Sequence, residues 1–353
     1  MKSNYRYIVK AFMAMAVIAG TTSCDDFLDR EPMSSISPET YYSTAAQLEA
    51  NLNDEYPNVL PSFGQWTYGI FGEDKGTDNQ IEVNANDRYT QDRWKVPHSE
   101  SDNWKFERIY RINFFLSEAL PKFGEDMSGS QNTISGSVAT IKHYIGEMYF
   151  LRAYEYFKKL QLFGDFPIIN QPLADEMEAL REASKRFPRN EVARFIISDL
   201  DKAYAYMSDV DMATTRINKD AAMLVKSRVA LFEATWLQNF KGTAFVPGGE
   251  GWPGASLHNN YQYPSGNIDN EVKYFLEQAV EASKLVADKY KGSLTENTGV
   301  LQQSADDPSN PYFDMFAQED LSDVKEVLLW RQYARGLSTL SLIHISEPTR
   351  LQL

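Results

Sequence analysis

Two loop-like stretches of the sequence place aromatic rings beside amide and guanidinium side chains, which suits non-covalent recognition of a ring-shaped polar ligand. A ring can stack on an apolar ligand face while Asn or Arg groups hydrogen-bond to the ligand's rim. The candidate contacts are Tyr89, Arg93, Trp94 and Asn103 in the first stretch, and Trp252, Tyr261 and Tyr263 in the second. Trp94 and Trp252 are the leading pair, and packing under a long loop is the alternative for each ring.

Motifs that mark enzyme chemistry are missing from the sequence. It has no glycine-rich phosphate loop, HExxH pair, GxSxG elbow or CxxC pair. Hard oxygen ligands for calcium are available at Glu73, Asp74, Asp78, Asn79 and Glu82. Because these five residues lack the spacing of an EF-hand loop, we favour a solvated acidic loop. We therefore predict a protein without enzyme activity, cofactor or metal, with calcium as the open alternative.

Composition supports a globular binding protein. The 353 residues include 49 acidic and 35 basic side chains, and the resulting charge of -14 argues against nonspecific attraction to nucleic acid. A content of 43% hydrophobic and 24% charged residues is far from that of disordered or multi-span membrane chains. Twenty Tyr, twenty Phe and six Trp exceed what core packing alone requires, so some rings should face a ligand or partner.

The first residues read as a secretion signal that ends in a lipidation site. Residues 1–23 begin with cationic side chains, continue with a short apolar run and close on small residues directly before Cys24. This order is typical of a bacterial lipoprotein signal, and the run is too short to span a bilayer. We predict that cleavage leaves Cys24 as the acylated first residue; an ordinary secretory signal is the alternative.

The last residues do not continue the pattern of the chain. Residues 341–353 lack the periodicity that precedes them and resemble a translated sequencing adapter. We predict that 341–353 is a non-native tail and that residues 24–340 form one helical domain that is incomplete at its C-terminal end. A genuine flexible tail is the alternative.

Amphipathic helices must form the frame that carries the aromatic loops. Apolar side chains recur at offsets of three, four and seven in residues 190–207, which is typical of one helix face. The same pattern predicts helices over residues 44–56, 106–120, 218–236 and 271–290. Thr44 and Gln47 can form a capping box, and Asn190 and Asn218 are the predicted N-caps of their helices.

Two of the helices carry further predictions. In residues 218–236 the shared face is predicted to contain Ala221, Leu224, Val225, Arg228, Leu231, Phe232 and Thr235. The helix over 141–163 is apolar on all sides, so it should be covered by several neighbours. Arg152 lies within it and needs an acidic partner, for which Glu155 and Asp199 are the candidates.

The fold class follows from these lengths and faces. Helices of about 18 to 22 residues that pair around a covered central one predict an all-α fold of stacked, tetratricopeptide-like helix pairs. A non-repetitive helical bundle is the alternative. Long irregular loops over 57–103, 240–270 and 292–323 complete the predicted architecture, and loops of this length are commonly functional.

The order of short motifs resembles the RagB/SusD family of Bacteroidetes outer-membrane lipoproteins, which capture glycans or other nutrients. The marks are CDDFLD at 24–29 with Pro32, RIN at 111–113, GE at 146–147, FLRAY at 150–154, FGDFP at 163–167, RNEV at 189–192, DL at 199–200, and AA at 221–222 with Arg228 and Trp236. The resemblance implies a tetratricopeptide-like helical body on the cell surface that docks on a TonB-dependent, SusC-like transporter. Family members usually continue well beyond this length.

The resemblance predicts the chemical class of the ligand. A sugar ring has an apolar C-H face and a hydroxyl rim, which matches the aromatic and polar groups of the two loops. We therefore expect a surface protein, anchored in the outer membrane through lipid, that delivers oligosaccharides to its transporter. A structural subunit or lid of the transporter with little ligand affinity, a binder of peptides and a surface hydrolase are the alternatives.

Overall fold

The computed structural model describes residues 41–61, 103–124, 126–207, 212–301, 304 and 306–332. Within these ranges the regular secondary structure is helical, and only isolated bridges occur in place of strands. The chain divides into two compact units, Met1–Tyr42 and Ser43–Leu353, and every helix described below belongs to the second. The all-α prediction is confirmed.

The described part of the second unit contains six long α-helices, two short ones and one 3-10 helix, η2 (Pro253–Ser256). The α-helices are α4 (Ala45–Val59), α5 (Glu107–Phe123), α6 (Val138–Phe163), α7 (Met177–Ala183), α8 (Arg189–Tyr206), α9 (Lys219–Asn239), α10 (Ile268–Tyr290) and α11 (Pro311–Phe316). The six long helices match the predicted ones, whereas α7 and α11 were not predicted. None of the helices in the described ranges is both long and apolar enough to cross a membrane.

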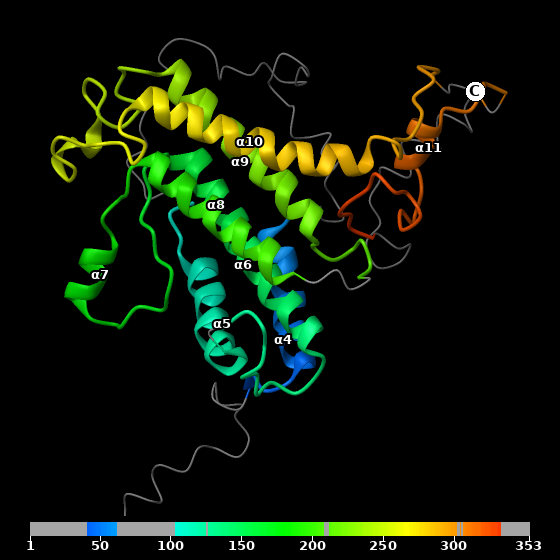
Figure 1. Cartoon of the computed structure of the whole chain (residues 1–353), viewed down its shortest axis with the longest axis horizontal. Coiled ribbons are helices and arrows are strands. Elements are labelled where there is room, and N and C mark those ends of the chain that lie inside the picture. Colours follow the sequence, from blue (N-terminus) through cyan, green and yellow to red (C-terminus); the bar gives the residue numbers. More distant parts are fainter. Residues whose placement is uncertain are drawn as a thin grey trace, which may run out of the picture. The chain divides into compact units, whose positions relative to one another are not determined.

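From α5 onward, successive long helices pack against one another in antiparallel fashion, and α4 packs on α6 (Figure 1). Arg189 at the start of α8 pairs with Glu233 near the end of α9. Lys289 at the end of α10 pairs with Asp220 at the start of α9. Helix α6 runs antiparallel to α8 and also contacts α4, α5 and α9. This row of helix pairs confirms the tetratricopeptide-like packing.

Helix α6 is covered on several sides, as its apolar circumference predicts. A close approach to α8 depends on Gly146, where an added Cβ atom would lie 2.9 Å from the Ala203 carbonyl oxygen and 2.8 Å from the Met207 nitrogen. The helix ends at Gly164, whose φ of 66° favours glycine. The residues after it form an extended segment that leads to α7.

A buried ion pair joins α6 to α8. The Arg152 Nε and Nη2 atoms donate to the two carboxylate oxygens of Asp199, at 2.6 and 2.8 Å. Asn113 of α5 accepts a third hydrogen bond from the same guanidinium, at 2.9 Å. Asp199 is therefore the predicted partner that the structure confirms, and these motif residues hold helices together.

Two predicted local features are confirmed and one is wrong. Thr44 and Gln47 form the capping box of α4, and the Asn218 side chain caps α9 by accepting from Ala221 N. Asn190 is not an N-cap, because α8 begins after Pro188 and Asn190 lies inside it. Its buried amide instead hydrogen-bonds to loop and α10 side chains, which explains why a capping residue type occurs there.

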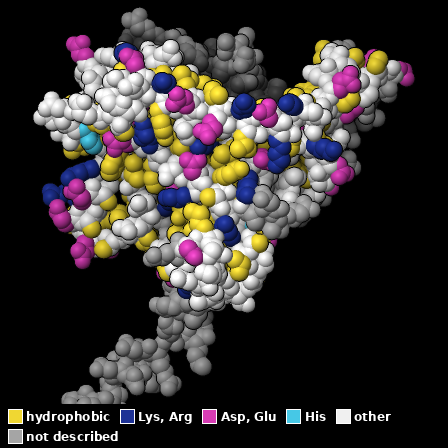
Figure 2. All heavy atoms as spheres, viewed as in Figure 1, with side chains coloured by type: hydrophobic (Ala, Val, Ile, Leu, Met, Phe, Trp, Pro, Cys, Tyr) yellow, Lys and Arg dark blue, Asp and Glu magenta, His cyan; other side chains and the backbone are white. Residues whose placement is uncertain are grey.

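The predicted buried face of α9 is largely wrong. Leu224 and Leu231 are 45% and 50% exposed, and Arg228 and Thr235 also face solvent. The buried face contains alanines, Met223, Val229, Leu237 and three charged residues. Asp220 pairs with Lys289, Lys226 with Asp201 and Glu233 with Arg189. Because paired charges lie inside the protein here, apolar periodicity indicated the wrong face. Figure 2 shows exposed hydrophobic side chains among charged ones on one side of the molecule.

Candidate functional site

The loop between α9 and α10 packs its aromatic rings against the bundle. Trp252 is only 5% exposed, and its indole N-H donates to Asp165 Oδ2 at 2.8 Å. Its ring also stacks on that of His258, with centroids 5.9 Å apart. Trp252 thus packs under the loop, which is the alternative that the sequence left open for each ring, and its indole anchors the loop. Glycan contact through it stays a prediction that requires the loop to move.

Tyr261 and Tyr263 are half-buried and committed to protein hydrogen bonds. The Tyr261 hydroxyl donates to Asn190 Oδ1 at 3.1 Å and accepts from Asn190 Nδ2 at 2.9 Å. The Tyr263 hydroxyl donates to the Pro247 carbonyl oxygen at 2.6 Å. Burial raises the pKa of both phenols well above the ordinary value, so both are protonated at neutral pH. Their role in ligand contact stays a prediction.

The first predicted neighbourhood is described only at its C-terminal end. Tyr89, Arg93 and Trp94 lie outside the described residues, as do the five candidate calcium ligands at 73–82. Asn103 is exposed, and its carbonyl oxygen accepts from Lys159 Nζ at 2.7 Å. The adjacent Trp104 ring packs edge-on against Phe163 and Phe166. The described end of this stretch thus lies beside the C-terminal end of α6.

Ring contacts and one backbone bridge link the described end of the first neighbourhood to the second. Trp104 contacts Phe166, and Phe166 pairs through its backbone with Phe187. The Phe187 ring lies 6.5 Å from that of His258, which stacks on Trp252. Stretches about 150 positions apart in the sequence therefore meet at the same end of the bundle, as a shared ligand site would require.

Buried charges hold this end of the bundle in place. Asp165 accepts the backbone N-H of Arg189 at 2.9 Å in addition to the Trp252 indole, and burial raises its pKa. The Arg189 guanidinium, paired with Glu233, lies 4.1 Å from the Trp236 ring centroid. Such pairs hold the helices and the loop in place, and they leave few unpaired charged side chains for a ligand.

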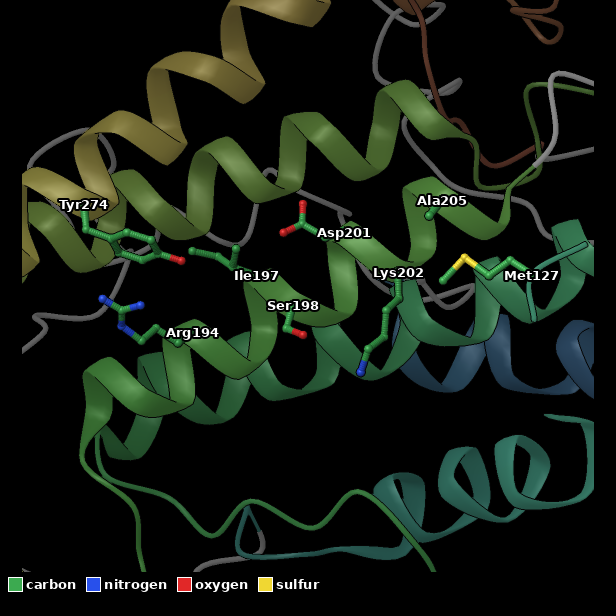
Figure 3. A pocket seen from close by; sticks show the side chains of 8 residues that line it. All are labelled: Met127, Arg194, Ile197, Ser198, Asp201, Lys202, Ala205 and Tyr274. Atoms are coloured by element: carbon green, nitrogen blue, oxygen red, sulfur yellow. The ribbon is translucent and has the colours of Figure 1, made fainter. Parts of the chain in front are cut away.

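The charges of a groove along the outer side of α8 are likewise used internally. The groove has a volume of about 340 Å³ and is lined by Met127, Arg194, Ile197, Ser198, Asp201, Lys202, Ala205 and Tyr274 (Figure 3). Arg194 pairs with Glu271 at 2.7 Å and lies 3.8 Å from the Tyr274 ring centroid. Asp201 accepts from Lys226. A ligand in this α8 groove would have to compete with these pairs.

A second groove, between α5 and the segment that follows α6, has different chemistry. This α5 groove has a volume of about 240 Å³ and is lined by Phe106, Ile109, Tyr110, Ile169, Gln171, Leu173, Asp175 and Leu180. Its floor is apolar, and Tyr110 is 51% exposed. Its lining contains no Lys or Arg. It therefore combines an accessible ring with polar groups at its rim.

No group of three or more His, Cys, Asp or Glu side chains in the described part of the chain could hold a metal ion. The α5 groove, the α8 groove and the loop between α9 and α10 all offer aromatic rings, and Tyr274 supplies the ring of the α8 groove.

Comparison with known proteins gives the chain a family match. Residues 26–231, more than half of the chain, match the SusD-like family, which is described as starch-binding and associating with the outer membrane. The chain belongs to the SusD-like family. The match covers α4, α5, α6, α7, α8 and the first part of α9. The family resemblance found in the sequence is thus confirmed.

Individual relatives are distant and longer. SusD-like protein P25 of Formosa agariphila is 25% identical over 233 residues, which are 61% of this chain and 41% of that protein. SusD-like protein P2 of the same organism is 25% identical and matches over 68% of this chain and 46% of its own length. The chain thus spans less than half the length of these curated relatives.

A solved SusD-like carbohydrate-binding protein from Bacteroides vulgatus is 14% identical, with a TM-score of 0.40 over 76% of this chain and 50% of that one. A SusD-like protein from Bacteroides fragilis is 20% identical, with a TM-score of 0.39 over 60% and 39% of the two chains.

The sequence did not point to the α5 groove. Tyr110 lies in a predicted helix, and its opposite wall comes from an extended segment and a short helix without clear periodicity. One signal was available, because Tyr110 falls outside the apolar face formed by Ile109, Ile112 and Leu116. A large ring outside that face is a candidate for a second task.

Proposed function

We propose that this SusD-like chain belongs to a surface protein that binds oligosaccharides and delivers them to a TonB-dependent transporter, without making or breaking bonds. The family match over residues 26–231 carries the proposal, because that family is described as starch-binding and associating with the outer membrane. Two features support it. The sequence lacks catalytic motifs, and the described end of the first aromatic neighbourhood lies at the same end of the bundle as the second.

Attachment to the outer membrane would occur through lipid on Cys24. The signal-like residues 1–23 directly before this cysteine support the proposal. Acyl chains contribute about 0.8 kcal/mol per buried CH₂ group, so two or more chains anchor a protein stably. Bacteroidetes cells that express the chain and grow with radioactive palmitate should yield a labelled protein. A Cys24→Ala variant should be unlabelled and should leave the membrane fraction.

Calorimetric titration of the full chain with neutral oligosaccharides tests the binding function. Heat of binding with unchanged sugar, checked by chromatography, supports capture. Conversion of the sugar to shorter products would instead support a hydrolase. The titration is repeated with the purified transporter present, because heat that appears only then would favour a structural subunit over an autonomous binder.

A further inference from the structure

Polar groups without protein partners gather at the α5 groove. Within the described part of the chain, the Tyr110 hydroxyl, the Gln171 amide and the Asp175 carboxylate lie at its rim without a hydrogen-bond partner. By contrast, the α8 groove uses its charges in ion pairs, and the loop tyrosines use their hydroxyls. The α5 groove thus keeps the hydrogen-bonding capacity of all three groups available to a ligand.

The wall of the α5 groove opposite Tyr110 is held in place by hydrogen bonds to its backbone. The Ile169 backbone N-H donates to the Tyr156 hydroxyl at 2.7 Å, and its carbonyl oxygen accepts from Asn113 Nδ2 at 2.9 Å. The next carbonyl oxygen, of Asn170, accepts from Arg152 at 3.1 Å. Three buried side chains of α5 and α6 therefore hold the extended segment in position, and a preformed site loses less entropy when it binds.

The ring and the floor match one face of a sugar. The Tyr110 ring leans on Phe114, with an interplanar angle of 24°, and remains half exposed. Ile109 and Ile169 supply apolar surface beside it. A volume of about 240 Å³ lies below that of drug-sized pockets, roughly 300–1,000 Å³, and suits a single ring.

We propose that the α5 groove is a subsite for one neutral sugar ring of an oligosaccharide, stacked on Tyr110 and hydrogen-bonded by Gln171 and Asp175. The subsite rests on the proposed glycan-binding function. Neutral rings are favoured because a free carboxylate lies at the rim and no Lys or Arg lines the groove. A uronic acid or sulfated ring would face like-charge repulsion there, in a chain of charge -14. A peptide side chain would fill the apolar floor but leave the three polar groups unused.

Titration of the full chain and its variants tests the subsite, with laminarihexaose, maltohexaose and xylohexaose as neutral probes and hexagalacturonate as the anionic one. Tyr110→Ala should weaken binding of the best neutral probe about tenfold, or about 1.4 kcal/mol. Tyr110→Phe keeps the stacking ring, so its affinity for the same probe should stay within about threefold of that of the unsubstituted chain. Tyr312→Ala is the matched control, because this tyrosine of α11 is 41% exposed and should leave affinity unchanged. Circular dichroism verifies that each variant is folded.

The outcomes separate the subsite from the function on which it rests. If the unsubstituted chain binds none of the sugars, the proposed function fails and the subsite with it. If a sugar binds and Tyr110→Ala behaves like Tyr312→Ala, the subsite alone is wrong. Asp175→Lys should reduce the preference for neutral over anionic probes at least about fivefold, since it exchanges repulsion for attraction. An unchanged preference, or tighter binding of a leucine-rich peptide than of any sugar, would overturn the assignment to neutral sugars.

Discussion

Replacing Asp199 with Ala should lower the free energy of unfolding by about 3–5 kcal/mol, because it leaves a buried charge without a counterion. Arg152 and Asp199 are both buried and share two hydrogen bonds, of 2.6 and 2.8 Å. Without the carboxylate, the guanidinium keeps only the neutral acceptors Asn113 Oδ1 and the Asn170 carbonyl oxygen. These cannot replace the lost charge interaction in a site that excludes water.

Thermal unfolding followed by circular dichroism measures the loss. Each kcal/mol lowers Tm by about 2–4 °C in domains of slightly smaller size, so Asp199→Ala should lower it by roughly 6–20 °C. The double variant Arg152→Met with Asp199→Leu should recover much of the difference, because an apolar pair removes the cost of desolvating both charges.

The matched control is Asp269→Ala, which breaks an exposed pair with Lys241 and should cost less than about 1 kcal/mol. If Asp199→Ala unfolds no earlier than Asp269→Ala, or if the double variant is less stable than Asp199→Ala, the reasoning about the buried pair is wrong.

Three further predictions concern packing and pH. Gly146→Leu should destabilise the protein by at least about 1–3 kcal/mol in thermal melts because the side chain would overlap α8, whereas Gly292→Ala, in open space, should be nearly neutral. Val229→Ser should lower the free energy of unfolding by more than about 1 kcal/mol, and Leu231→Ser should lower it by less than about 0.5 kcal/mol. Equal effects would contradict the observed buried face of α9. Burial raises the pKa of the Asp165 carboxyl above its ordinary value of 3.8. The carboxyl therefore contributes fully to the free energy of unfolding below pH 3.8, and this contribution is lost as the pH rises through the pKa of the folded state. The stability of Asp165→Asn relative to the unsubstituted protein should therefore increase between pH 4 and pH 7, and a constant difference would refute the shift.

Local patterns were enough to predict the helical frame. The capping side chains Thr44 and Asn218 mark where helices begin, and Gly164 marks where α6 ends, since each acts within one turn of its own position. Asn190 shows the limit of this reasoning. Its residue type fits a cap, but its amide bonds to Tyr261 and Glu271, which are distant in sequence.

The candidate site could be predicted only in part, because it depends on contacts between distant segments. The sequence identified Trp252 as an informative ring, but only the packing shows that Asp165 binds its indole N-H and keeps it inside. The buried face of α9 was missed for a similar reason. Glu233 looks like a surface residue until its partner Arg189, 44 positions away, is known.

The tethers of the loop between α9 and α10 make it a natural module for protein engineering. Its attachments include the Asp165 carboxylate, which binds the Trp252 indole, and the Asn190 amide, which binds the Tyr261 phenol. A transplanted loop of other length and composition should seat on the same scaffold if it presents an indole and a phenol to these two groups. The binding specificity of the loop could thus be changed without any change in the helices beneath it.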